Sequence, residues 1–134
     1  MKAFVPIMKS TKAKLSLSLV WLLLIWTLSS LPSNDLPGLK ILSIDKVAHL
    51  GIYLILGLLV NGVLKSIKAG RITISLVYAI LLLNAALDET HQQFIPGRSV
   101  SIYDLMANSL GLVLAYLWML RQARGYLPHK EASK

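Results

Sequence analysis

Four long apolar stretches, separated by short polar and basic segments, constrain this chain more than any other feature. They cover about residues 15–31, 46–64, 72–92 and 103–120, and a helix needs about 20 mainly apolar residues to cross a bilayer. Only 15% of the residues are charged, against about 25% in a soluble domain. The sequence therefore predicts a single all-α membrane domain over residues 1–134, built as a four-helix transmembrane bundle.

Positive charge is distributed unevenly between the two sides of this bundle. Eleven Lys and Arg residues lie in the terminal tails and in the loop between the second and third stretches, whereas three lie on the other side: Lys40, Lys46 and Arg98. Cytoplasmic loops carry the excess of Lys and Arg, so both termini are expected in the cytoplasm. The net charge of +8 does not indicate nucleic-acid binding, because the basic residues flank apolar stretches instead of forming one patch.

The first stretch has an alternative interpretation as a cleaved signal peptide, because basic residues precede it and the small residues Ser29 and Ser30 close it. Its 17 residues, two of them tryptophan, are long for the apolar core of such a peptide, and Leu31-Pro32 is a poor cleavage site. We expect it to remain as the first span. It carries no ionisable group, so its expected role is that of scaffold.

Acidic residues collect on one side of the predicted bundle. Four of the six lie at the outer ends of the second, third and fourth stretches: Asp45, Asp88, Glu89 and Asp104. The third stretch is apolar only as far as Leu87, too short to span, so it must include the polar residues that follow. Three pairs are four residues apart and share a helix face: Asp45 with His49, Asp88 with Gln92, and Asp104 with Asn108. Ionisable groups within membrane segments are candidates for a functional site.

Structural interpretations compete with this one. Ser101 and Asp104 fit a capping box, and Asp45 fits a cap of the second helix. Gly97 belongs to a Pro-Gly turn. Small residues every fourth position let helices approach closely, and the fourth stretch carries two of them: Gly111 and Ala115.

Three spaced motifs run through the last three stretches. They are D-K-x-x-H over residues 45–49, D-E-x-x-Q-x-F-x-P-G-R over 88–98 and D-x-x-x-N-x-x-G over 104–111, with Tyr53 after the first. This order and spacing resembles the VanZ-like family of small polytopic bacterial membrane proteins. The family is named for a member associated with resistance to teicoplanin, a lipid-bearing glycopeptide antibiotic. The resemblance implies a multi-pass protein of the bacterial inner membrane and attaches no reaction to the chain.

The first functional hypothesis is binding or sensing, without catalysis, at the outer face. The ligand would be an amphiphile: a membrane lipid with an anionic headgroup, a cell-wall precursor or a cell-wall-directed lipoglycopeptide. Helix N-termini attract anions, so Arg98 would contact the anionic group with support from Lys46. The remaining members would form a polar lining that holds Arg98 in place: Glu89, Gln92, Asp104 and Asn108.

Two further hypotheses remain open. In a membrane-embedded hydrolase or transferase acting on a lipid phosphate, His49 would be the acid or base, oriented by Asp45, with Asp88 or Glu89 as the second titrating group. The third hypothesis is a purely structural polar network. A metal site at His49, His91 and Asp88 lacks a ligand-spacing motif, so neither a metal nor another cofactor is expected.

Overall fold

The structure is a computed structural model and describes residues 10–32 and 42–126. Within these residues it contains four long helices, one short 3-10 helix and no strand, which confirms the all-α expectation. The elements are α1 (Thr11–Ser29), α2 (Leu42–Ser66), α3 (Arg71–His91), η2 (Gln92–Phe94) and α4 (Ile102–Tyr126). All four long helices are long and apolar enough to cross a membrane.

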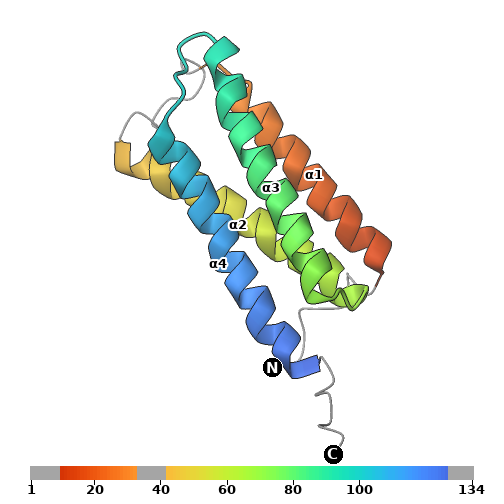
Figure 1. Cartoon of the computed structure of the whole chain (residues 1–134). Helices are drawn as coiled ribbons and strands as arrows, with labels where there is room; N and C mark the ends of the chain where they lie inside the picture. Colours follow the sequence, from red (N-terminus) through yellow and green to blue (C-terminus); the bar gives the residue numbers. More distant parts are fainter. Residues whose placement is uncertain (1–9, 33–41, 127–134) are drawn as a thin grey trace, which may run out of the picture.

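The four helices lie lengthwise beside one another and run alternately up and down, with α2 inclined to the others (Figure 1). Helix α2 contacts α1 and α4, and α4 also contacts α3. Three of the helices extend beyond the apolar stretches: α1 begins at Thr11, α2 begins at Leu42 and α4 continues to Tyr126. Hydropathy marks the part of a helix that lies in lipid, whereas backbone hydrogen bonding continues through the polar flanks. Helix α3 includes Asp88 and Glu89, as its short apolar stretch requires.

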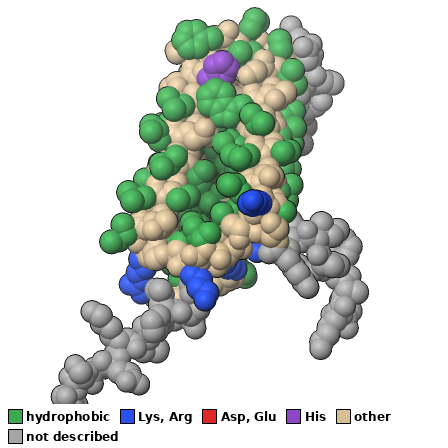
Figure 2. Space-filling model, turned by 90° about the vertical axis from the view of Figure 1, so that its right-hand side faces the viewer, with side chains coloured by type: hydrophobic (Ala, Val, Ile, Leu, Met, Phe, Trp, Pro, Cys, Tyr) green, Lys and Arg blue, Asp and Glu red, His purple; other side chains and the backbone are tan. Residues whose placement is uncertain are grey.

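The outward surface of the bundle is apolar along most of its length, as Figure 2 shows for one face. Large side chains such as Leu23, Ile72, Leu83 and Trp118 are exposed on it. Acyl chains are as apolar as leucine, so this surface suits lipid and not water. Inside the bundle, Tyr53, Leu56, Ile74, Leu112 and Met119 are among the largest fully buried side chains.

Helices α2 and α4 approach each other closely. A Cβ atom on Gly111 would overlap the backbone carbonyl of Leu50 and lie 2.8 Å from the backbone nitrogen of Leu54. A Cβ atom on Gly57 would overlap that of Ala115. The two helices therefore meet backbone to backbone, which brings together the side chains that α2 and α4 carry at their N-terminal ends.

Charge divides along the long axis of the bundle. The C-terminal ends of α1 and α3 and the N-terminal ends of α2 and α4 share one end, which we call the cluster end because all four acidic residues of the described part lie there. Most of the described Lys and Arg residues lie at the opposite end, where Figure 2 shows Lys and Arg side chains gathered. At this end Lys14 Nζ donates to Ser66 Oγ at 2.6 Å.

Candidate functional site

Polar side chains from the last three long helices and the α3–α4 connection gather at the cluster end. We call this set the polar cluster: Asp45, Lys46, His49, Tyr53, Asp88, Glu89, Gln92, Arg98, Asp104 and Asn108. Seven of its members are buried: His49, Tyr53, Asp88, Glu89, Gln92, Asp104 and Asn108. The pairs that share a helix face in the sequence all belong to it.

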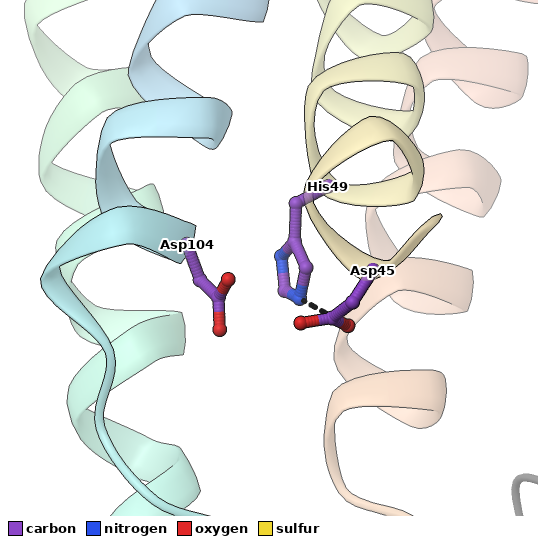
Figure 3. A group of neighbouring side chains, drawn as sticks. All are labelled: Asp45, His49 and Asp104. Atoms are coloured by element: carbon purple, nitrogen blue, oxygen red, sulfur yellow. Dashed lines mark ion pairs between the residues drawn. The ribbon is translucent and has the colours of Figure 1, made fainter. Parts of the chain in front are cut away.

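One half of the polar cluster joins α2 to α4. The ammonium group of Lys46 lies 3.2 Å from Asp45 Oδ2 and also pairs with Asp104 Oδ1. His49 Nδ1 lies 3.0 Å from Asn108 Oδ1, and His49 Nε2 lies 3.6 Å from Asp45 Oδ1 (Figure 3). Two carboxylates, an imidazole and an ammonium thus form one connected group.

The other half is built around the two adjacent acids of α3. Tyr53 donates its hydroxyl proton to Asp88 Oδ2 at 2.8 Å, and the backbone N–H of Ser101 donates to Glu89 Oε1 at 2.6 Å. Both acids are 1% exposed. Their remaining oxygens, Asp88 Oδ1 and Glu89 Oε2, have no hydrogen-bond partner among the described residues. An unsatisfied buried acceptor is costly, so these two oxygens favour a donor that the described chain does not supply.

The capping interpretations are partly wrong. Ser101 does cap α4, since its Oγ accepts from the backbone N–H of Asp104 at 3.4 Å. In a capping box the backbone N–H of Ser101 would donate to Asp104. Here it donates to Glu89 of α3 instead, and the Asp104 carboxylate pairs with Lys46. Asp45 does not cap α2, because that helix already begins at Leu42 and Asp45 lies within its first turn.

Helix α1 takes part in the site, contrary to the expectation that it is scaffold alone. Arg98 donates from Nε to the carbonyl of Leu31 at 3.1 Å and from Nη2 to that of Leu28 at 3.2 Å. Gln92 donates to Ser29 Oγ at 3.2 Å. Arg98 is therefore held by the C-terminal end of α1, and not by the carboxylates and amides expected to hold it. Backbone carbonyls leave no trace in a sequence pattern, so this role was not predictable.

A cavity of about 120 Å³ opens beside the polar cluster, between α1, α2 and α3. Its polar lining comes from six side chains: Ser29, Asp45, His49, Asp88, Gln92 and Arg98. Ile25, Leu28 and Ile52 supply apolar walls. A separate groove of about 700 Å³ runs between α2 and α4 and is lined almost entirely by apolar side chains, with Lys46 among its lining residues.

The structure groups the possible metal ligands differently from the sequence. Asp45, His49 and Asp104 each offer one ligand atom, and these atoms lie within 4.8 Å of one another. His91 instead faces α1, with its Nε2 3.2 Å from Ser30 Oγ, and Asp88 is bonded by Tyr53. The two residues of the expected acid–base pair are hydrogen-bonded to different partners: His49 to the side chain of Asn108, and Glu89 to the backbone N–H of Ser101.

Comparison with known proteins identifies the family. The model of the VanZ/LLP1 family matches residues 3–122. The chain belongs to the VanZ/LLP1 family. No curated protein and no solved structure matches it. The family match includes α1, and with four helices able to span a membrane this VanZ-family chain is a multi-pass membrane protein.

Proposed function

We propose that this VanZ-family protein binds the headgroup of a phospholipid at the polar cluster, on the outer side of the bacterial inner membrane. The observation that carries the proposal is the cavity lined by Arg98, Asp88 and His49 at the cluster end of an otherwise apolar bundle. Burying such groups in a membrane segment is expensive, and it is offset when a ligand of complementary charge binds to them.

Arg98 supplies the contact for an anionic group. A guanidinium has five N–H donors, and the bonds to the carbonyls of Leu28 and Leu31 use two of them. A phosphate accepts well from the N–H groups that remain along the edge of the guanidinium plane. These two bonds also fix the position of the guanidinium in the cavity wall, so little side-chain entropy is lost when a phosphate binds.

Asp88 adds a second requirement to the ligand. Its Oδ1 has no partner among the described residues, and its side chain lines the same cavity as Arg98. A headgroup with an N–H or O–H donor beside its phosphate would satisfy both side chains. Phosphatidylethanolamine has this combination, whereas phosphatidylcholine has a phosphate and no such donor. The cavity volume of about 120 Å³ suits a small phospholipid headgroup better than a much larger glycopeptide.

Native mass spectrometry of the detergent-solubilised protein tests this proposal. We expect phosphatidylethanolamine to be retained in preference to phosphatidylcholine when both are supplied at equal concentration. Arg98→Ala should reduce retention of both lipids several-fold, and Asp88→Asn should remove the preference between them. Arg71→Ala, an exposed arginine at the opposite end, is the matched control. Equal retention of both lipids, unchanged in Arg98→Ala, would leave the polar cluster as a structural network.

A further inference from the structure

We propose that Asp45, His49 and Asp104 bind a divalent transition-metal ion of the Zn²⁺ class at the cluster end of the bundle. Figure 3 shows the three side chains directed toward a common space, two from α2 and one from α4. Their ligand atoms lie within 4.8 Å of one another. With metal–ligand bonds of about 2.0–2.2 Å in a tetrahedral site, two ligands of one ion lie about 3.3–3.6 Å apart, so side-chain rotations that bring the ligand atoms closer by up to about 1.5 Å complete the site.

The bonding of His49 gives an independent indication of a cation. Because Asn108 Oδ1 can only accept, its 3.0 Å contact places a proton on Nδ1, and in the neutral imidazole this leaves a lone pair on Nε2. His49 is 8% exposed, and its Nε2 has no hydrogen bond within the described part of the chain. In this neutral form the Nε2 lone pair faces Asp45 Oδ1 at 3.6 Å, an arrangement that either a proton on Nε2 or a metal ion between the two atoms would stabilise. A ligating histidine is typically oriented in this way by a bond to its other nitrogen.

The ammonium group of Lys46 already neutralises part of the negative charge of the two carboxylates. This ammonium pairs with Asp45 and Asp104, the two acids of the set. The Lys46 side chain is 24% exposed and carries a flexible four-carbon stem, so the ammonium can move toward solvent when a doubly charged ion takes its place. Lys46 is therefore an internal competitor for the metal.

The donor set selects the class of ion. Two carboxylate oxygens and one imidazole nitrogen suit Zn²⁺, Mn²⁺ or Fe²⁺, whereas Ca²⁺ and Mg²⁺ prefer oxygen ligands alone. Three protein ligands leave at least one coordination position open. The site goes beyond the lipid proposal and does not depend on it, because Arg98 and Asp88 are outside the ligand set and the ion alone is the probe.

Zn²⁺ titration of the purified chain, without a histidine tag, tests the site against a chromophoric competitor. The titration uses a chain with His91→Ala and His129→Ala, in which His49 is the remaining histidine. We expect one Zn²⁺ per chain. His49→Gln and Asp104→Asn should each weaken binding by roughly tenfold or more, since each removes one of three ligands. Lys46→Met should tighten it by roughly tenfold, because it removes a competing positive charge and no ligand. Lys65→Met, an exposed lysine at the opposite end, is the matched control.

Three results would overturn the site. The first is the absence of stoichiometric Zn²⁺ from both the parent chain and Lys46→Met. The second is equal affinity in the parent chain, His49→Gln and Asp104→Asn. The third is unchanged Zn²⁺ affinity in Lys46→Met. This variant retains all three ligands, so it tests the site even if a variant that lacks a ligand fails to fold. Lipid retention measured on the same preparations separates failure of this site from failure of the lipid proposal.

Discussion

Some buried polar groups of the polar cluster are stabilised by a single hydrogen bond. Asp88 is 1% exposed, and the only hydrogen bond that its carboxylate accepts from the described residues comes from the Tyr53 hydroxyl at 2.8 Å. Tyr53 itself is fully buried. A charged or polar group with so few partners is sensitive to the loss of any one of them, because the alternative partner, water, is scarce in the interior of a membrane bundle.

Tyr53→Phe should therefore lower the free energy of unfolding by about 1–2 kcal/mol, because it leaves both carboxylate oxygens of Asp88 without a donor. Reversible unfolding in mixed micelles of increasing SDS content measures this change. Tyr103→Phe removes the same hydroxyl at a position that is 69% exposed and should change the value by less than about 0.5 kcal/mol. Equal effects of the two substitutions would contradict the assignment of the bond.

The residues of the polar cluster were predictable, but most of their partners were not. Spacing of four along each helix places Asp45 beside His49 and Asp104 beside Asn108 from the sequence alone. That Lys46 neutralises Asp104, and that Glu89 completes the cap of Ser101, depends on which helices pack together. Side-chain partners across helices follow from tertiary packing, which a single sequence does not encode as a pattern.

At the scale of elements, the close contact of α2 with α4 positions the metal-ligand set. The small residues Gly111 and Ala115 predict a close helix contact, but not which helix would be the partner. The structure shows that α2 fills this position, with Gly57 opposite Ala115 and the backbone of Leu50 opposite Gly111. Asp104 reaches Lys46 only because the two backbones are this near.

Gly111→Ala should destabilise the bundle by about 1–3 kcal/mol, because the new methyl group meets backbone atoms of Leu50 and Leu54 that cannot move aside. Gly51→Ala is the matched control on α2, since a Cβ atom there has no neighbour within 4 Å. It should leave stability unchanged or raise it by up to about 1 kcal/mol through helix propensity. SDS unfolding compares the two variants, and destabilisation of the same size in both would rule out a close contact at Gly111.

At the scale of the whole molecule, charge is segregated between the two ends of an apolar bundle. The acidic residues of the described part lie at the cluster end, together with Lys46 and Arg98, and the other described Lys and Arg residues lie at or near the opposite end. The four spans were predictable because hydropathy is a local property of the sequence. The count of eleven basic residues against three then predicts that the cluster end faces away from the cytoplasm.

Cysteine labelling tests this orientation directly, because the chain has no cysteine of its own. Ser99 and Lys68 are both exposed and lie in the connections at opposite ends of the bundle. In intact spheroplasts, a membrane-impermeant maleimide should label Ser99→Cys and should label Lys68→Cys only after permeabilisation. The reverse pattern would place the cluster end in the cytoplasm, and labelling of both variants in intact cells would indicate two orientations. Either result would require the phospholipid ligand to be sought in the inner leaflet as well, since the headgroup must come from the leaflet at which the cavity lies.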